Sequence, residues 1–342
     1  SWVVRPRSIW APGPPFWGPN PSIINKKPMK TLKLPVLILL AALTASPARS
    51  MPVYNGDDRQ DPYEVEDREA LALADSTVAL FPSDKVSFRG NRAMLKTRAF
   101  GKEAGLCEGE RFSEQRTGAD CSGVLGGPDL VLTAGHCVRN NTLCAMTSFV
   151  FGFALSEEDS ALRSVPASEV YSCAFLVGHE AEAKGADWAV VRLDRPVRGH
   201  RPLKVERRKV TRGMPLMVVG YPNGLPVKLA GGARVTDDTP EKYFKTNLDT
   251  FQGNSGSPVF NERTKGIVGV LVRGEDDFEL VDLPGGKQCR KTRRCAGADC
   301  RGEDVTRVSR FADLIPNGIQ TRFQDSASES SSFSDLRDLA GK

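Results

Sequence analysis

Three short segments of the sequence carry side chains that together could perform nucleophilic chemistry. LVLTAGHCV contains His136 after an apolar run, GADWAVVRLD contains Asp187 before one, and FQGNSGSPVF contains Ser255 in a tight cluster of turn residues. A serine hydroxyl is a poor nucleophile at neutral pH, so it needs a base within hydrogen-bond reach and a partner that fixes the tautomer of that base. The sequence offers one candidate for each of these roles.

The turn around Ser255 is rich in residues that tolerate unusual backbone angles. Gly253 and Gly256 flank the Asn254–Ser255 pair, and glycine adopts conformations that other residues resist. Such a turn can aim the backbone N–H groups of Gly253 and Ser255 at one point and form an oxyanion hole. The alternative is a plain loop, because turn residues this dense usually mark one.

Each segment also has an ordinary structural interpretation. A lone histidine is more often structural, and Asp187 could simply cap the entry to a strand. Taken together, in the order His, Asp, Ser, the three favour catalysis. The other two histidines, His179 and His200, lie in polar runs, and we expect both at the surface.

The motifs TAGHC, ADWAVV and GNSGSP resemble the three active-site signatures of trypsin- and chymotrypsin-like serine endopeptidases. DVTRVSRFADLI is similar to the last strand and C-terminal helix of trypsins, whereas Asn254, NGDDRQ and VVGYP look more like the bacterial branch that includes the glutamyl endopeptidases. The resemblance spans roughly residues 53–318. It implies two six-stranded antiparallel β-barrels with a C-terminal helix, the active site between the barrels, and a disulfide that joins Cys121 and Cys137.

The resemblance also implies the role of each site residue. His136 takes the proton from Ser255 as its hydroxyl attacks a peptide carbonyl, while Asp187 stays ionised and holds the imidazole. The N–H groups of Gly253 and Ser255 stabilise the oxyanion, and no metal or cofactor is needed. The sequence therefore predicts a monomeric serine endopeptidase that acts on protein or peptide substrates. A binding protein on an inactive protease fold is the alternative.

Specificity is less strongly indicated. Asp249 lies six residues before Ser255, at the spacing of the pocket-floor aspartate of trypsins, where a carboxylate would select Lys or Arg; an ordinary loop carboxylate is an equal alternative. The glutamyl enzymes place a histidine where this chain has Leu271, which argues against a Glu preference, but Arg273 is close enough to leave that preference open. Asp249, Thr250, Leu271 and Arg273 are the candidate pocket residues.

The rest of the chain has the texture of an all-β protein. Short apolar runs bounded by Gly, Pro, Asn or Asp predict strands, and one segment, Ser309–Ile315, is the best candidate for a helix. Many short strands followed by a late helix indicate a barrel or sandwich. The predicted strands cover residues 76–81, 121–125, 130–134, 148–155, 188–193, 215–222 and 266–272.

Composition narrows the function classes. The 40% hydrophobic and 26% charged content is that of a globular protein, and the net charge of +5 is small for 342 residues. With 7% aromatics and no recognisable binding motif, a nucleic-acid partner is disfavoured. The eight cysteines contain no Cys-x-x-Cys pair, so disulfides are favoured over a zinc site.

The N-terminal region predicts export. Lys30 and Lys33 precede an apolar run of about ten residues and a small-residue cleavage site, as in secretory signals. The run is too short to span a bilayer, so we expect no stable membrane anchor and a location in the periplasm or outside the cell. The expected organisation is an upstream extension (1–28), a signal peptide (29–48), an acidic segment or short propeptide (49–75), a protease domain (76–318, with barrels at about 76–200 and 201–318) and a Ser-rich tail (319–342).

Overall fold

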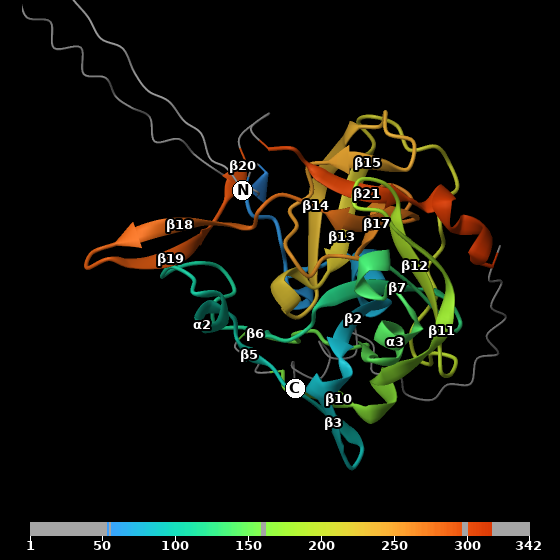
Figure 1. The fold of residues 1–342 in the computed structure, drawn as a ribbon, viewed down its shortest axis with the longest axis horizontal. Helices are drawn as coiled ribbons and strands as arrows, with labels where there is room; N and C mark the ends of the chain where they lie inside the picture. The colour runs from blue at the N-terminus through green and yellow to red at the C-terminus, as the bar shows by residue number, and fades with distance from the viewer. Residues whose placement is uncertain (1–52, 55, 159–161, 296–299, 317–342) are drawn as a thin grey trace, which may run out of the picture. The chain divides into compact units, whose positions relative to one another are not determined.

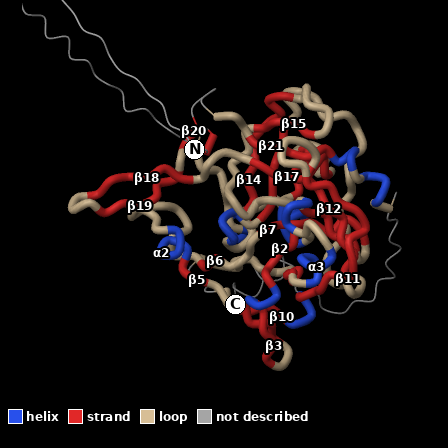
Figure 2. The backbone as a smooth tube through the Cα atoms, viewed as in Figure 1, coloured by secondary structure: helices blue, strands red, loops and turns tan. Residues whose placement is uncertain are grey.

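The computed structural model describes residues 53–54, 56–158, 162–295 and 300–316 (Figure 1). The predicted upstream extension, signal peptide and Ser-rich tail lie outside the described residues. Strands dominate the described part, and its helices are short (Figure 2).

Two closed barrels of six antiparallel strands form the body of the protein, as predicted. The first, in hydrogen-bonded order, contains β11 (Val170–Ala181), β12 (Asp187–Leu193), β8 (Leu130–Thr133), β7 (Cys121–Gly127), β2 (Thr77–Pro82) and β9 (Thr147–Val150). The second contains β13 (Pro215–Gly220), β14 (Lys228–Asp237), β15 (Tyr243–Thr246), β21 (Glu303–Arg307), β17 (Ile267–Arg273) and β16 (Pro258–Asn261).

Most barrel strands are apolar on both faces because both faces are buried; β11, β14 and β15, which are partly exposed, are the exceptions. On β2, Val78 and Leu80 belong to the apolar cluster inside the first barrel, whereas Ala79 and Phe81 belong to a second cluster to which both barrels contribute. Successive side chains of a strand point to opposite faces, so a strand between two cores reads as a continuous apolar run. This explains why every predicted strand lacks a polar alternation. The run at 148–155 is strand only as far as Val150.

Shorter elements decorate the barrels. A long excursion between β2 and β7 forms β3 (Val86–Arg89), β4 (Arg92–Leu95), β5 (Arg98–Ala99), α2 (Phe100–Ala104) and β6 (Arg116–Thr117). A hairpin of β18 (Phe278–Leu283) and β19 (Lys287–Thr292) extends from the second barrel beside α2 (Figure 1). The remaining helices and strands are β1 (Val53–Tyr54), η1 (Pro62–Glu64), α1 (Arg68–Asp75), η2 (Ser83–Lys85), η3 (Gly135–Cys137), α3 (Asn141–Ala145), β10 (Ser164–Pro166), η4 (Ala167–Glu169), η5 (Pro222–Gly224), β20 (Arg294–Cys295), η6 (Val308–Arg310) and η7 (Ala312–Leu314).

Both ends of the described chain pack on the barrels. Asp67 caps the N-terminus of helix α1, and its side chain accepts the N–H of Glu69. The helix buries Leu71 and Leu73 in the shared apolar cluster. The acidic segment therefore contributes to the core; its assignment as a mature segment or a short propeptide stays a prediction. The helix predicted at Ser309–Ile315 is present as the two short 3-10 turns η6 and η7.

A buried ion pair attaches the N-terminal segment to the second barrel. Lys228 on β14 is 2% exposed, and its Nζ donates to Asp61 Oδ1 (2.6 Å), Gln115 Oε1 (2.8 Å) and the carbonyl of Pro226 (3.0 Å). Burial lowers the pKa of Lys228 to about 8, although the charge of Asp61 opposes this shift. All three ammonium donors are thus used, and Asp61 supplies the only carboxylate among them.

We expect Asp61→Ala to lower the free energy of unfolding by about 3–5 kcal/mol, because it leaves the Lys228 ammonium buried without a counter-charge. Urea unfolding with the disulfides intact measures the change. Asp313→Ala is the matched control, because Asp313 pairs with Arg207 but its side chain is 98% exposed; its cost should stay below about 1 kcal/mol. Equal costs for the two variants would contradict this account.

His200 is a structural residue, so the prediction that it lies at the surface is wrong. Its side chain is 9% exposed, with Nε2 2.7 Å from Glu169 and Nδ1 3.1 Å from Asp75, and its ring stacks on Phe151. Burial alone would lower the pKa of His200, but the two carboxylates overcome it and raise the pKa to about 9. His179 on β11 is exposed, as expected.

A group whose pKa is higher in the folded state stabilises the fold fully below its unfolded pKa and loses that effect as the pH rises through its folded pKa. For His200 the window runs from about 6.5 to about 9. We therefore expect the stability difference between wild type and His200→Gln to shrink by about 2–3 kcal/mol across this window. Unfolding measured at several pH values, with His179→Gln as control, tests this; a pH-independent difference would contradict it.

Candidate active site

His136 and Asp187 meet because they lie at adjoining ends of paired strands. In the pairing of β8 with β12, Thr133 is opposite Ala189; His136 follows β8 in η3, and Asp187 is the first residue of β12. Asp187 Oδ2 lies 2.6 Å from His136 Nδ1, and Oδ1 accepts the backbone N–H of His136 at 2.9 Å. These two contacts fix the position of the carboxylate relative to the imidazole.

The environment of Asp187 favours one tautomer of the histidine. Asp187 is 5% exposed, and a carboxylate at Nδ1 keeps the proton on that nitrogen and leaves Nε2 as the acceptor. The start of β12 is itself held by the second barrel: the hydroxyl of Thr306 on β21 accepts the N–H of Asp187 (3.1 Å) and donates to its carbonyl (2.9 Å). Residues of both barrels therefore orient His136.

Ser255 is carried by a turn that contacts the first barrel directly. Ser122 on β7 donates its N–H to the carbonyl of Ser255 (2.8 Å) and its hydroxyl to the carbonyl of Gly253 (2.8 Å). On the other side, the N–H of Gly256 donates to the carbonyl of Leu271 at 2.7 Å. The turn is thus fixed from two directions, and it brings Ser255 to the same region as His136.

The two glycines of this turn are required by its geometry. Gly253 and Gly256 have φ angles of 89° and 87°, a region that glycine occupies without steric cost. A Cβ at Gly256 would also lie 2.1 Å from the carbonyl oxygen of Ser122. Asn254 between them is 3% exposed and accepts the hydroxyl of Ser257 at 3.0 Å, so an uncharged residue holds the centre of the turn.

The N–H groups of Gly253 and Ser255 are uncommitted. Within the described part of the chain neither has an acceptor, whereas the intervening N–H of Asn254 donates to the carbonyl of Phe251 at 2.9 Å. The turn therefore presents two free donors beside the Ser255 hydroxyl. Among the described residues there is no hydrogen bond between Ser255 Oγ and His136 Nε2. Such bonds often form fully only with substrate in place.

Cysteines brace the region around His136. Cys121 on β7 is bonded to Cys137, the residue after His136. The three side chains lie close enough together to suggest a metal site, but both sulfur atoms are used in the disulfide and offer no thiolate. The other disulfides are Cys107–Cys289, Cys144–Cys173 and Cys295–Cys300.

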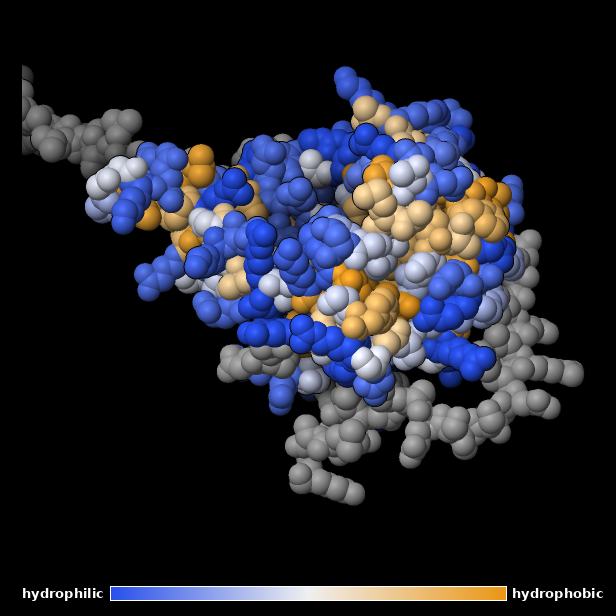
Figure 3. Space-filling view, turned by 60° about the horizontal axis from the view of Figure 1, so that its bottom comes forward, coloured by the Kyte–Doolittle hydropathy of each residue, from blue (hydrophilic) through white to orange (hydrophobic). Residues whose placement is uncertain are grey.

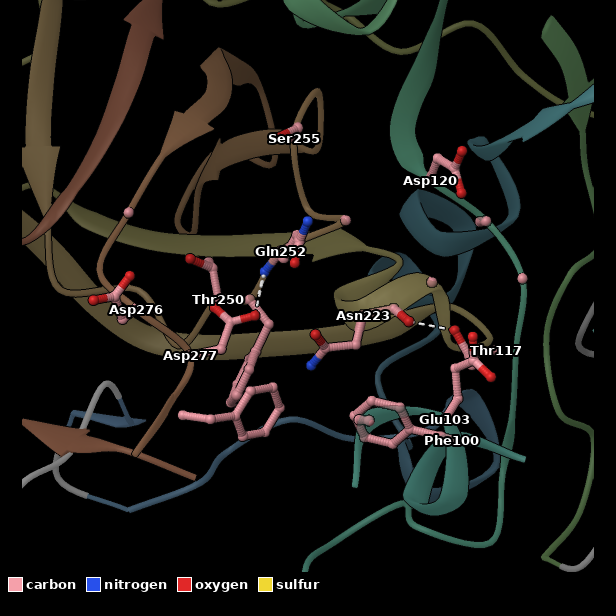
Figure 4. A pocket seen from close by; sticks show the side chains of 18 of the residues that line it. Phe100, Glu103, Thr117, Asp120, Asn223, Thr250, Gln252, Ser255, Asp276 and Asp277 are labelled. Atoms are coloured by element: carbon pink, nitrogen blue, oxygen red, sulfur yellow. Dashed lines mark hydrogen bonds between the residues drawn. The ribbon is translucent and has the colours of Figure 1, made fainter. Parts of the chain in front are cut away.

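A large pocket of about 1010 Å³ opens beside Ser255. Thr250, Leu271 and Arg273, three of the predicted pocket residues, line it. Figure 4 shows Ser255 at one end of the pocket, with Gln252 below it and Asp277 close to Gln252. The backbone N–H of Gln252 donates to the carboxylate of Asp277. The pocket also reaches the hairpin β18–β19 and helix α2.

Asp249 does not face this pocket, which corrects the prediction made from its spacing. It is 3% exposed, and its carboxylate accepts the N–H groups of Tyr54 (2.7 Å) and Asp58 (3.2 Å) of the N-terminal segment. Burial, followed by the charge of Asp58, raises the pKa of Asp249 to about 8. The carboxylate therefore binds backbone behind the pocket rather than a ligand within it.

The guanidinium of Arg273 also points elsewhere. It donates to Asp304 Oδ2 (3.1 Å) and to the carbonyls of Glu182 (3.1 Å) and Gly185 (2.7 Å), and its Nη1 lies 3.9 Å from Asp187 Oδ2. Arg273 thus braces the loop before Asp187, and its charge is unavailable to bind a carboxylate in the pocket.

Sequence reasoning missed Glu303, a buried acid at the pocket. Glu303 begins β21, is 3% exposed, lines the pocket and accepts the hydroxyl of Thr250 at 2.7 Å. It directly precedes the segment whose similarity to the last strand of trypsins was noted. The signal that could have indicated Glu303 is its place directly before the trypsin-like segment 304–315, combined with its contact to Thr250.

A disulfide holds the hairpin that forms one wall of the pocket. Cys289 on β19 is bonded to Cys107, which follows α2. Phe278, at the base of the hairpin, packs near both Phe100 of α2 and Phe251 of the Ser255 turn. The projecting hairpin, at the left of Figure 3, carries hydrophobic as well as hydrophilic residues; Leu280 is 64% exposed.

Comparisons with known proteins give one family match and several similar solved structures. Residues 121–270 match the family model described as the trypsin-like peptidase domain. Similar solved structures include a Glu endopeptidase (19% identity, 71% of this chain, 94% of that chain, TM-score 0.42). They also include the Rv3671c protease from M. tuberculosis in its active form (16% identity, 74% of this chain, 85% of that chain, TM-score 0.40). A third is the VesB protease of Vibrio cholerae (16% identity, 75% of this chain, 65% of that chain, TM-score 0.45). No curated protein sequence matches the chain significantly.

The family match includes strands of both barrels, from β7, which carries Cys121, to residue 270 in β17. Residues 121–270 thus carry the match to the trypsin-like peptidase domain, and the two closed barrels give the described chain the chymotrypsin-like fold.

Proposed function

We propose that this protein is a secreted serine endopeptidase in which Ser255 is the nucleophile, His136 the general base and Asp187 the residue that orients His136. The observation that carries this proposal is the double contact of Asp187 with the ring and the backbone of His136, at 2.6 and 2.9 Å. The trypsin-like peptidase family implies protein substrates.

The first half of the reaction forms an acyl-enzyme. The Ser255 oxygen bonds to the peptide carbonyl carbon while its proton passes to His136 Nε2, and the carbonyl oxygen becomes an oxyanion that accepts the N–H groups of Gly253 and Ser255. When the C–N bond breaks, the imidazolium returns its proton to the leaving amine. Asp187 remains ionised and stabilises the positive charge on His136.

The second half regenerates the enzyme. A water molecule attacks the ester carbonyl and gives its proton to His136, and the Ser255 oxygen leaves and recovers that proton. Protein groups alone carry these steps. The uncommitted N–H groups at the Ser255 turn support this mechanism, since they need not break other hydrogen bonds before they bind the oxyanion.

We also propose that the residue before the scissile bond is Lys or Arg. The wall of the pocket contains the acids Glu275, Asp276, Asp277 and Glu303, which favour a cationic side chain. A preference for Glu, the alternative, would need a cation beside these acids, but the guanidinium of Arg273 is bound to Asp304 and to backbone carbonyls. The pocket lining also contains Lys85, Lys96, Arg98 and Arg290, of which Lys85 pairs with Asp120 and Arg98 with Glu103.

A non-catalytic binding protein on the same fold is disfavoured, because a residue of the required type occupies each of the three catalytic positions. Four disulfides favour an oxidising compartment, in agreement with the predicted signal peptide. No helix among the described residues is long and apolar enough to cross a membrane. We expect the enzyme to act as a monomer.

Ser255→Ala should lower kcat/KM for peptide hydrolysis by roughly four to six orders of magnitude, because the nucleophile is lost while the oxyanion donors remain. A fluorogenic peptide assay measures the rate. Mass spectrometry should detect one added phosphonyl group per wild-type chain after treatment with a serine-directed phosphonate, and none on the variant. Ser87→Ala, an exposed serine on β3, should behave as wild type. Near-normal turnover by Ser255→Ala would refute the assignment.

Asp187→Asn should keep the shape of the site but lower kcat by roughly 10⁴-fold. The amide would donate to Nδ1 and drive the histidine proton to Nε2, where it blocks proton transfer from the serine. The same assay measures kcat, and circular dichroism checks the fold. A loss of less than about tenfold in a folded variant would show that Asp187 does not set the tautomer.

A further inference from the structure

Glu303 is a buried carboxylate at the pocket that has no cationic partner among the residues that the structure describes. Oε2 accepts the hydroxyl of Thr250 at 2.7 Å, and Oε1 accepts the N–H of Glu275 at 3.3 Å. Gly274 lies directly against the carboxylate, since a Cβ on Gly274 would lie 1.9 Å from Oε2. Thr250, Gly274 and Glu303 all line the cavity that contains Ser255.

The cations near Glu303 are bound to other acids. Arg301 Nη2 lies 2.6 Å from Asp304, which also binds Arg273 at 3.1 Å, and Arg293 lies 3.4 Å from Glu275. Within the described segments of the chain, no Lys or Arg lies within ion-pair distance of Glu303. An ionised carboxylate buried in this way is costly unless a counter-charge arrives.

We propose that Glu303, rather than Asp249, selects the substrate by pairing with the cationic side chain of a Lys or Arg immediately before the scissile bond. The inference rests on the proposed function and adds the residue that sets the specificity. The substrate cation would supply the counter-charge that the fold omits, and the Thr250 hydroxyl would hold the carboxylate in place. A neutral side chain of equal size would leave this charge unpaired.

The ionisation of Glu303 gives the proposal a second signature. Burial raises the pKa of Glu303 to about 8, while hydrogen bonds from Thr250 and Glu275 oppose this shift. Below this pKa the free enzyme carries a neutral acid, which has no charge with which to attract a cation. The titratable and charged groups that face Glu303 are Tyr54, Glu275, Asp277 and Arg301. Of these, Asp277 is the one that could titrate in the same range, because burial raises its pKa to about 7.

The experiment compares two fluorogenic peptides that differ only in arginine or citrulline before the scissile bond. The two side chains have nearly the same shape, but only arginine is charged. The ratio of their kcat/KM values cancels every pH-dependent step that the two substrates share. Active-site titration with the phosphonate gives the concentration of competent enzyme in each preparation.

Three variants separate the candidate acids. Glu303→Gln keeps the size and the acceptor for Thr250 but removes the charge. Asp249→Asn is the matched control, a carboxyl with the same 3% exposure that lies outside the pocket. Asp277→Asn tests the rival acid within it.

The wild type should prefer arginine by roughly 30-fold to 1000-fold at pH 9, Glu303→Gln should reduce this ratio nearly to one, and Asp249→Asn should leave it unchanged. The wild-type ratio should also rise by up to about tenfold per pH unit below about 8 and level off above it. This pH profile tests the proposal even if Glu303→Gln does not fold.

Different failures have different meanings. A wild type that neither binds the phosphonate nor cleaves any peptide overturns the proposed function and this inference with it. An active wild type with a ratio near one overturns the inference alone. An unchanged arginine-to-citrulline ratio in folded Glu303→Gln also overturns the inference. A ratio that falls to about one in Asp277→Asn or Asp249→Asn, but not in Glu303→Gln, overturns it as well. A wild-type ratio that does not vary with pH between 6 and 9 also overturns it.

Discussion

The arrangement of the site depends on a short contact between the backbones of the two barrels. Ser122 on β7 donates its N–H and its hydroxyl to carbonyls of the turn that carries Ser255, so the turn of the second barrel is held by a strand of the first. The neighbouring residue on β7, Cys121, is bonded to the cysteine that follows His136. One strand therefore sets the positions of both candidate reacting side chains, and a shift of β7 would move the two together.

Buried polar side chains elsewhere in the fold are also held by contacts to several partners. Most barrel strands have apolar cores on both faces, so a polar side chain that is buried there is costly unless it finds partners. Lys228 uses its three donors on three acceptors, and His200 places a carboxylate at each ring nitrogen. Glu303 is different, because its hydrogen bonds come from neutral groups. That difference is the observation on which the proposed substrate-binding role of Glu303 rests.

The sequence predicted the parts of the molecule that local patterns specify. The paired barrels and the family followed from short two-sided strands and three motifs, since a turn such as GNSGSP encodes its own geometry through its glycines. The catalytic roles remain predictions. Side chains whose direction depends on distant segments were not predicted. The acids that contact His200 come from α1 and η4, and the carboxylate of Asp249 is held by backbone N–H groups of the N-terminal segment. Helix α1 was missed because its one buried face is only two turns long.

Chemistry and specificity therefore depend on the sequence in different ways. The proposed oxyanion donors and the proposed nucleophile lie within three consecutive residues, so a match to the motif carries their geometry with it. The pocket is assembled from at least three segments, around Thr250, Gly274 and Glu303, and its electrostatics depend on which acids lack a cation. The spacing of Asp249 matches that of a trypsin pocket floor, yet the carboxylate binds the N-terminal segment, which leaves the pocket to an acid from another strand. A specificity assignment in this fold must therefore follow unpaired buried charge in three dimensions, because spacing from the nucleophile does not determine which way a side chain points.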